Sequence, residues 1–347
     1  MSQLLSRPPY SRRNDDLFLQ EMNALTRHHR DGCAEWRRFF PDWKGSQKIQ
    51  NLPFLHVGLF KRMPLKTVAG GIKHGRTVFS SATTGASSQI VLDQRSSVFQ
   101  SRSTHKIFVD FIGEKKRPLL VLDSSESLRQ RGNLSAQTAA AMSLQSLSSE
   151  IYFLLERPQE PDSLKRDFLA EFLKENDDFI VYGFSWILWL TFGQKEPLKE
   201  IAGLMKGKRI TFIHSGGWKK LEARRIARDH FNRSLLGDLD PSSHVFDYYG
   251  LVEQLGIVYP LCEYEARHVP VWADVLVRDS YTLRPLESKI GQLQLLNTLA
   301  YGAPYHNVLT EDLGLLIPGP CRCGRSGKRF RLEGRIPKAD LRGCANV

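Results

Sequence analysis

Residues 210–220 read ITFIHSGGWKK, a short apolar run followed by a hydroxyl residue, two glycines and a basic segment. An uninterrupted apolar run of this length is typical of a strand buried on both faces of a parallel sheet. Two further runs share this character, RPLLVLD at 117–123 and FIVY at 179–182. Between and after them the sequence predicts helices, an amphipathic one over residues 163–174 and a basic one over residues 219–231. This alternation indicates an α/β fold with a largely parallel sheet.

The flanks of this region have a different character. Residues 1–50 carry apolar side chains at helical spacing and are expected to form a helical N-terminal segment. Residues 51–265 form the α/β core, in which residues 127–155 are expected to be mostly helical because they are rich in Ala, Ser and Leu. Residues 266–347 are expected to form a β-rich subdomain and a C-terminal tail, since short apolar runs separated by turn residues replace the alternating pattern.

Composition and charge exclude several classes of protein. The chain of 347 residues has a formal charge of +12 and ordinary hydrophobic content, which does not fit a disordered or fibrous chain. Its basic residues are spread along the sequence without a nucleic-acid-binding motif, so no nucleic-acid partner is expected. Five irregularly spaced cysteines do not form a secreted disulfide framework. No signal peptide or transmembrane segment is recognisable, so a cytoplasmic protein is expected.

Two loops suit the binding of a nucleotide. Residues 80–88, SSATTGASS, combine hydroxyl groups with small side chains, so that backbone N–H groups and hydroxyls can both donate to phosphate oxygens. A flexible surface loop is the alternative interpretation. Residues 214–219, HSGGWK, follow a strand at the edge where α/β sheets bind ligands, and paired glycines allow a flat ring to lie against the backbone. An ordinary tight turn is the alternative there.

Three further segments carry residues of the same kind. In YYGLVEQ at 248–254 an aromatic ring could stack on a base and the carboxylate of Glu253 could hold Mg²⁺. TEDLG at 310–314 is expected to be a turn whose acidic side chain accepts hydrogen bonds from ribose hydroxyls. Arg335 follows Gly334 and could bind a ribose or a phosphate. Taken singly, each segment also fits a solvent-exposed surface.

The order of these segments resembles the order of core motifs in the adenylate-forming superfamily, which includes acyl-CoA synthetases, peptide-synthetase adenylation domains and luciferase. From about residue 50 onward the chain is most similar to the LuxE family, the acyl-protein synthetases of bacterial bioluminescence. The segments that carry this resemblance are LPFLHVGLFK, SSATTGASSQIVLD, HSGGWKK, YGLVEQ, CRCGR and GRIPKADLRGC. The resemblance implies the large N-terminal domain of an adenylate-forming enzyme with a small β-rich subdomain, and no full mobile C-terminal domain.

The resemblance also implies an activity and roles for individual residues. The activity is ATP-dependent adenylation of a fatty or aryl carboxylic acid, followed by transfer of the acyl group to a thiol. The phosphates of ATP would be bound by Ser80, Ser81, Thr83, Thr84 and Gly85. The adenine would be bordered by Ser215, Gly216 and Gly217, with Tyr249 stacked on it. Glu253 would bind Mg²⁺, and the ribose would be held by Asp312 and Arg335.

The family resemblance places an acyl-accepting cysteine at Cys344, where Arg342 could lower the pKa of the thiol. Thr84, Glu253 and Cys344 are therefore the expected catalytic residues. An inert cysteine on a frayed tail is the alternative for Cys344, and the acceptor could instead be an acyl-carrier or reductase protein.

Two other features have simpler alternatives. The Cys-x-Cys pair Cys321 and Cys323 could bind zinc with Cys262 and Cys344, but the spacing favours a structural turn. The run around Trp186 and Trp189 could line an acyl pocket, although aromatic residues at this spacing are more often part of the core.

Three departures from the superfamily pattern favour a second hypothesis. Ala82 adds a methyl group where the phosphate loop usually has glycine, and Ser88-Gln89 stand where a lysine is common. The chain also ends shortly after the Gly-Arg motif. A catalytically weakened nucleotide- or acyl-binding subunit of a biosynthetic complex is therefore the alternative to an active ligase.

Overall fold

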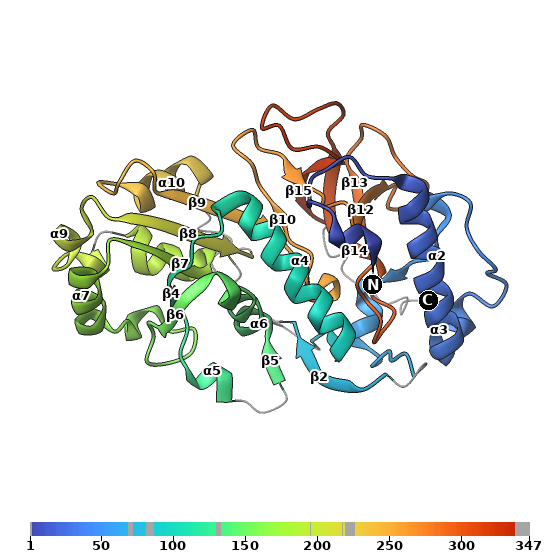
Figure 1. Ribbon diagram of the computed structural model, residues 1–347, viewed down its shortest axis with the longest axis horizontal. Helices are drawn as coiled ribbons and strands as arrows, with labels where there is room; N and C mark the ends of the chain where they lie inside the picture. The colour runs from blue at the N-terminus through green and yellow to red at the C-terminus, as the bar shows by residue number, and fades with distance from the viewer. Residues whose placement is uncertain are drawn as a thin grey trace, which may run out of the picture.

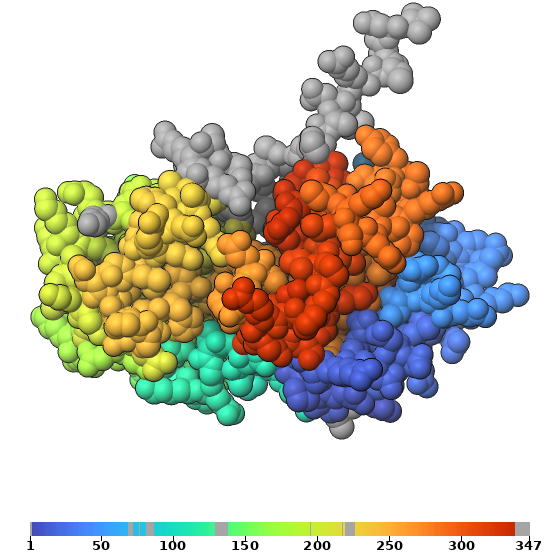
Figure 2. All heavy atoms as spheres, turned by 90° about the horizontal axis from the view of Figure 1, so that it is seen from above, coloured from blue at the N-terminus to red at the C-terminus, as the bar shows by residue number. Residues whose placement is uncertain are grey.

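The computed structural model describes residues 2–68, 72–80, 87–129, 133–194, 196–216, 218 and 226–336. In Figure 1 a parallel sheet with its helices occupies one half of the molecule, and an antiparallel sheet with the N-terminal helices occupies the other. The long helix α4 (Gln94–Ile112) runs between the two halves. In the space-filling view of Figure 2, the surface of residues around 226–260, in yellow, meets that of residues around 270–336, in orange and red.

The sheet of the first half confirms the predicted α/β core. Its strands run in the order β10-β9-β8-β7-β4-β6, and all neighbours pair in parallel except β10, which is antiparallel to β9. The strands are β4 (Arg117–Val121), β6 (Ser148–Phe153), β7 (Asp178–Phe184), β8 (Arg209–Ser215), β9 (His244–Tyr249) and β10 (Tyr259–Pro260). The three apolar runs recognised in the sequence are β4, β7 and β8, and their side chains are almost entirely buried.

Short helical elements connect and cover these strands. The helices are α5 (Glu126–Arg129), α6 (Ala136–Ser143), α7 (Arg166–Glu175), α8 (Ser185–Leu188), α9 (Ala202–Met205) and α10 (Arg228–Leu236). Further turns of helix are η3 (Gln145–Leu147), η4 (Pro161–Ser163), the π-helical η5 (Trp189–Gly193), η6 (Glu196–Leu198) and η8 (Val252–Gln254). The amphipathic helix expected at 163–174 is α7, and the basic helix expected at 219–231 has its described part in α10.

An antiparallel sheet is formed mainly by strands after residue 266, where the sequence predicts a β-rich region. Its strands run in the order β11-β15-β14-β13-β12, and β1 pairs in parallel with β14. The strands are β1 (Leu55–His56), β11 (Arg267–His268), β12 (Ala273–Arg278), β13 (Gly291–Asn297), β14 (Asn307–Leu316) and β15 (Arg329–Arg335). A third, small sheet contains β2 (His74–Phe79), β3 (Gln89–Asp93) and β5 (Asn133–Ser135).

The N-terminal region is helical as expected, and it packs on the antiparallel sheet. Its elements are α1 (Gln3–Ser6), α2 (Asp15–Gly32), α3 (Ala34–Phe39), η1 (Ile49–Asn51) and η2 (Val57–Lys61). Phe18 and Trp36 share one hydrophobic core with Trp272 and Leu295 of the sheet region. The two ends of the sequence thus stabilise each other.

Helix α4 joins the two halves through its buried side chains. Asp93 caps its N-terminus by accepting hydrogen bonds from the backbone N–H groups of Arg95 and Ser96. Ile107 belongs to the core of the antiparallel half, whereas the adjacent Phe108 belongs to a core beneath the parallel sheet. Successive residues on this helix therefore bury their side chains against different sheets.

Two expectations about secondary structure were wrong. Residues 127–155 are not mostly helical, because Ser148–Phe153 form β6 at the edge of the parallel sheet, where pairing with β4 prevails over local composition. Residues 310–314 are not a turn but the middle of β14, paired with β13 and β15. Gly314 suits this place because a Cβ atom there would lie 2.7 Å from the side chain of Leu293.

Candidate active site

Two neighbouring parallel strands, β8 and β9, end side by side at the carboxyl edge of the sheet, where Ser215 pairs in register with Tyr248. The chain then turns at Gly216, whose φ of +78° lies in the left-handed region that favours glycine. Ser185 fixes this turn, because its hydroxyl donates to the carbonyl oxygen of Gly216 and lies 2.9 Å from Nδ1 of His214. Burial lowers the pKa of His214, which keeps the ring neutral in this dry environment.

Three of the predicted site residues meet at one carboxylate. The hydroxyl of Tyr249 donates to Oδ2 of Asp312 at 2.7 Å, and Nε of Arg335 donates to Oδ1 at 2.8 Å. Asp312 and Arg335 are direct cross-strand partners on β14 and β15, which explains their proximity. Burial, reinforced by the charge of Asp312, raises the pKa of Tyr249 well above its usual range, so the phenol stays protonated and donates.

The ring of Tyr249 is itself packed. Its centroid lies 5.9 Å from that of Tyr259 and 6.1 Å from that of Phe330, with the latter ring edge-on. The residue is only 8% exposed. The ring of Tyr249 is thus held by the aromatic core, and its hydroxyl is held by Asp312.

Glu253 lies in η8, close to the base of the hydroxyl-rich loop. The loop is closed by Ser80 and Ser88, since the N–H of Ser88 donates to Oγ of Ser80 at 2.8 Å and the N–H of Ser80 donates to the carbonyl oxygen of Ser88. Burial raises the pKa of Glu253, and the neighbouring Ser88 hydroxyl offsets part of that rise. Oγ of Ser88 is buried, and no hydrogen bond of ordinary geometry to it is found within the described part of the chain. A buried carboxylate beside a spare hydroxyl is an oxygen-rich setting suited to Mg²⁺.

The position of Glu253 is fixed by a buried hydrogen-bond network and by a close contact with helix α4. The next residue, Gln254, donates to the carbonyl oxygen of Tyr305 at 2.8 Å and accepts from the side chain of Asn297 at 3.0 Å. Gly256 packs against α4 so tightly that a Cβ atom there would lie 2.4 Å from Cβ of Gln100. A side chain at 256 would displace η8, and with it the carboxylate.

A lysine that the sequence did not single out adds a positive charge near these carboxylates. Pairing of β1 with β14 places residues 55–61 beside the strand that carries Asp312. Nζ of Lys61 lies 3.8 Å from a carboxylate oxygen of Glu311, and its charge also opposes the rise in the pKa of Glu253. The apolar LPFLHVGLFK segment gave no chemical signal for this role, which arises only from the strand pairing.

The remaining predicted residues fall into two groups. Ser81, Thr83, Thr84, Gly85, Gly217 and Cys344 lie outside the described residues, as do Ala82 and Arg342. Trp186 and Trp189 pack on the hydrophobic core around α10, where the ring of Trp189 contacts Phe231. Their placement agrees with the core interpretation.

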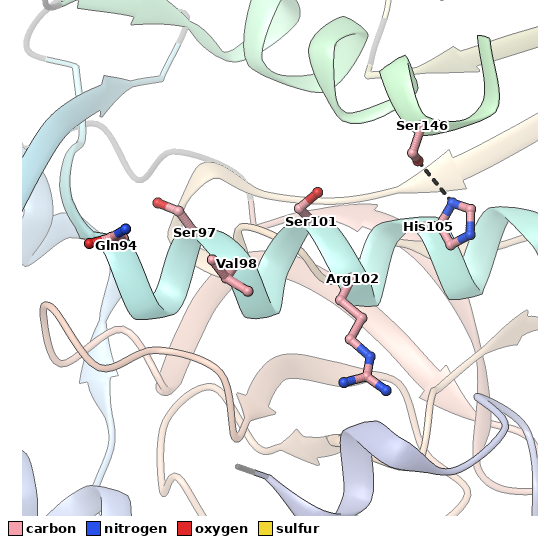
Figure 3. A pocket seen from close by; sticks show the side chains of 7 residues that line it. All are labelled: Gln94, Ser97, Val98, Ser101, Arg102, His105 and Ser146. Carbon is pink, nitrogen blue, oxygen red and sulfur yellow. Dashed lines mark hydrogen bonds between the residues drawn. The ribbon is translucent and has the colours of Figure 1, made fainter. Parts of the chain in front are cut away.

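An open hollow of about 500 Å³ lies along the exposed side of α4 and contains none of the predicted site residues. Figure 3 shows it from close by: Ser97, Ser101 and His105 line one side of the helix, and His105 is hydrogen-bonded to Ser146 at 2.9 Å. The hollow is distinct from the cluster around Asp312 and Glu253.

Comparison with known proteins identifies the family. The model of the family described as acyl-protein synthetase, LuxE, matches residues 5–347. The chain belongs to the LuxE family. Long-chain-fatty-acid–luciferin-component ligases are relatives: the Aliivibrio fischeri protein is 27% identical over 146 residues, and the Vibrio harveyi protein is 25% identical over 142. Each alignment covers 40% of this LuxE-family chain, and 37% and 36% of the respective relatives.

Solved structures show that this member of the LuxE family has the fold of adenylate-forming enzymes. An open conformation of 2-hydroxyisobutyryl-CoA ligase, in complex with 2-HIB-AMP and CoA, matches 93% of this chain and 70% of its own, with a TM-score of 0.64 and 12% identity. ATP-bound MatB from Rhodopseudomonas palustris matches 78% of this chain and 50% of its own, with a TM-score of 0.50 and 14% identity. The expected fold class is thereby confirmed. Across the described residues, every helix is too short or too polar to cross a membrane.

Proposed function

We propose that this chain is an ATP-dependent ligase that activates a carboxylic acid as its acyl-adenylate and passes the acyl group to a thiol. The observation that carries the proposal is the convergence of Tyr249, Asp312 and Arg335 on one side and Glu253 with Ser80 and Ser88 on the other. These are the groups that a ribose and a polyphosphate require, and they come from four separate segments of the sequence.

Asp312 acts as the ribose-binding group in this proposal. Its carboxylate offers about four acceptor positions, of which Tyr249 and Arg335 use two. The remaining positions can accept from the two ribose hydroxyls. Since both protein partners donate to the carboxylate, they fix its orientation before the nucleotide binds.

Glu253 and the hydroxyl loop act at the phosphates. Ser80 and Ser88 bond to each other at the base of the loop, and the hydroxyl-rich sequence between them is proposed to donate hydrogen bonds to phosphate oxygens. Glu253 is the residue that would hold Mg²⁺, which supplies positive charge to the phosphate oxygens as the acid attacks the α-phosphorus. The carboxylate oxygen of the acid then bonds to that phosphorus while the bond to pyrophosphate breaks.

The acyl acceptor and the acid complete the proposal. The acid is fatty or aromatic, consistent with relatives whose names specify a long-chain fatty acid. Cys344 is the proposed acceptor in the chain itself: its thiolate attacks the acyl carbon, AMP leaves and a thioester forms. An acyl-carrier or reductase protein is the proposed onward partner.

The test is pyrophosphate release with ATP, Mg²⁺ and hydroxylamine over a panel of fatty and aromatic acids. We expect release that depends on the acid and that falls at least about 100-fold in Glu253→Gln, because the metal-binding carboxylate is lost. Glu287→Gln is the matched control, since Glu287 is exposed and remote from the site residues in sequence. Folded protein that binds ATP but releases no pyrophosphate with any acid would refute the ligase and favour a binding subunit.

A further inference from the structure

Four potential metal ligands meet away from the nucleotide site. Cys262 follows β10, His268 lies in β11, and Cys321 and Cys323 lie in the turn between β14 and β15. One ligand atom from each of the four lies within 4.8 Å of every other. Three thiols and an imidazole from separate segments thus converge on one point inside the fold, and Cys323 is the only one of the four that is not fully buried.

The distances suit a tetrahedral ion and do not suit a disulfide. The sulfur atoms of Cys262 and Cys321 are 3.8 Å apart, and Sγ of Cys323 lies 3.3 Å from Nε2 of His268. In a tetrahedral zinc site with Zn–S bonds of about 2.3 Å, two sulfur ligands lie about 3.8 Å apart and a sulfur and a nitrogen about 3.5 Å apart. A disulfide would require about 2.0 Å between the sulfurs, and all three cysteines are free.

The surroundings also favour a charged metal–thiolate centre. Three thiolates around Zn²⁺ leave one net negative charge, and the positive charges of Arg325 and Arg329 act on His268 from close by. Nε of Arg329 is buried without a hydrogen-bond partner among the described residues, and it is therefore free to donate to a thiolate. Gly324, with φ of +81°, allows the tight turn in which its N–H donates to the carbonyl oxygen of Cys321.

We propose that Cys262, His268, Cys321 and Cys323 bind one structural Zn²⁺ ion. Binding replaces three S–H bonds by three Zn–S bonds and releases up to three protons, while the neutral imidazole donates its lone pair. Four protein ligands close the coordination sphere and leave no position for water, so the ion has a structural role rather than a catalytic one. The fourth ligand is His268, and not Cys344, which was the fourth member of the zinc alternative considered from the sequence.

The site connects the two large sheets. Cys262 follows β10, which pairs with β9 of the parallel sheet, whereas the other three ligands belong to the antiparallel sheet and its turn. Tyr249 lies on β9, and Asp312 lies on β14. The zinc ion therefore fixes the junction across which Tyr249 and Asp312 form their hydrogen bond.

The first measurement is the metal content of the full chain, purified in reducing buffer without chelator, by inductively coupled plasma mass spectrometry. We expect about one zinc per chain. Replacement by Co²⁺ should give the visible absorption bands and the sulfur-to-cobalt charge-transfer band of a tetrahedral thiolate site. Wild-type protein that takes up neither ion after reconstitution would overturn the proposal, as would a Cys262–Cys321 disulfide found in protein purified without reductant.

Variants locate the site without reference to enzymatic activity. Cys323→Ser should lower the bound zinc by about tenfold after dialysis against a weak chelator, because one of four ligands is lost. Cys33→Ser is the matched control: Cys33 is a free, buried cysteine in the core of the N-terminal helices. Equal zinc content in both variants would contradict the assignment. Should Cys323→Ser fail to fold, the Co²⁺ spectrum of the wild type still decides.

Discussion

Removing the hydroxyl of Tyr249 should destabilise the folded chain and loosen the proposed ribose site. Tyr249 and Asp312 are 8% and 6% exposed, so their 2.7 Å hydrogen bond is shielded from water. A hydrogen bond to a charged group contributes about 1.5–3 kcal/mol. The unfolding entropy of a chain of this length is about 0.7 kcal/mol/K, so Tyr249→Phe should lower the midpoint of thermal unfolding by about 2–4 °C.

A double-mutant cycle separates this bond from other effects of the substitution. Tyr249→Phe, Asp312→Ala and the double variant are unfolded at pH 7 and followed by circular dichroism. We expect a coupling energy of about 1.5–3 kcal/mol between the two positions, because the second substitution removes a bond that the first has already broken. Tyr281→Phe is the control, since Tyr281 is 96% exposed and should change stability by no more than about 0.5 kcal/mol.

The same variants test the link to the nucleotide. Tyr249→Phe keeps the aromatic ring, so it should raise the KM for ATP less than Asp312→Ala, which removes the acceptor for the ribose hydroxyls. A coupling energy below about 0.5 kcal/mol, which is the additivity expected of independent sites, would refute the shared hydrogen bond. Equal KM values in both variants would refute the assignment of Asp312 to the ribose.

Two further predictions concern Glu253 and Cys344. Glu253→Gln should increase the free energy of unfolding at pH 7, because burial raises the pKa of Glu253 in the folded state and its ionised form is therefore unfavourable there. The gain should be absent below the unfolded pKa of about 4.3 and should grow as the pH rises through the folded pKa. Above the folded pKa it should level off at about 1.4 kcal/mol for each unit by which folding raises the pKa of Glu253. A gain independent of pH would contradict this cause. Cys344→Ser should abolish the hydroxylamine-labile acyl label on the chain while leaving acid-dependent pyrophosphate release intact, and persistent labelling would move the acceptor elsewhere.

The strands that could be predicted from the sequence are those whose burial is visible as an uninterrupted run of apolar residues. β7 and β8 are covered on both faces, so their residues are apolar without interruption. β6 has no such run, because it lies at the sheet edge and several of its side chains face solvent. Asp312 lies in a strand that reads as a turn from its acidic and glycine neighbours, and only pairing on both sides reveals its true conformation.

The candidate site likewise contains residues that the sequence could predict and residues that it could not. Motif order was enough to nominate Tyr249, Asp312 and Arg335, and the fold brings them into contact. Motif order could not find Lys61, because its position depends on the pairing of β1 with β14 across more than 240 residues of sequence. It could not find His268 either, since the spacing of Cys262 and His268 to the Cys-x-Cys turn follows no zinc-finger pattern and only the fold makes them neighbours.

The hairpin of β14 and β15 joins the two proposed sites. Asp312 and Arg335 face each other near its open end, and Cys321 and Cys323 lie in its connecting turn. At the first place Tyr249 ties the hairpin to the parallel sheet, and at the second the zinc ion would tie it to the segment after β10. A hairpin held at two points cannot pivot about either one, so the carboxylate of Asp312 keeps its position before ATP arrives. Binding of the nucleotide then costs less conformational entropy, because the site is already ordered. More of the binding energy can therefore stabilise the transition state.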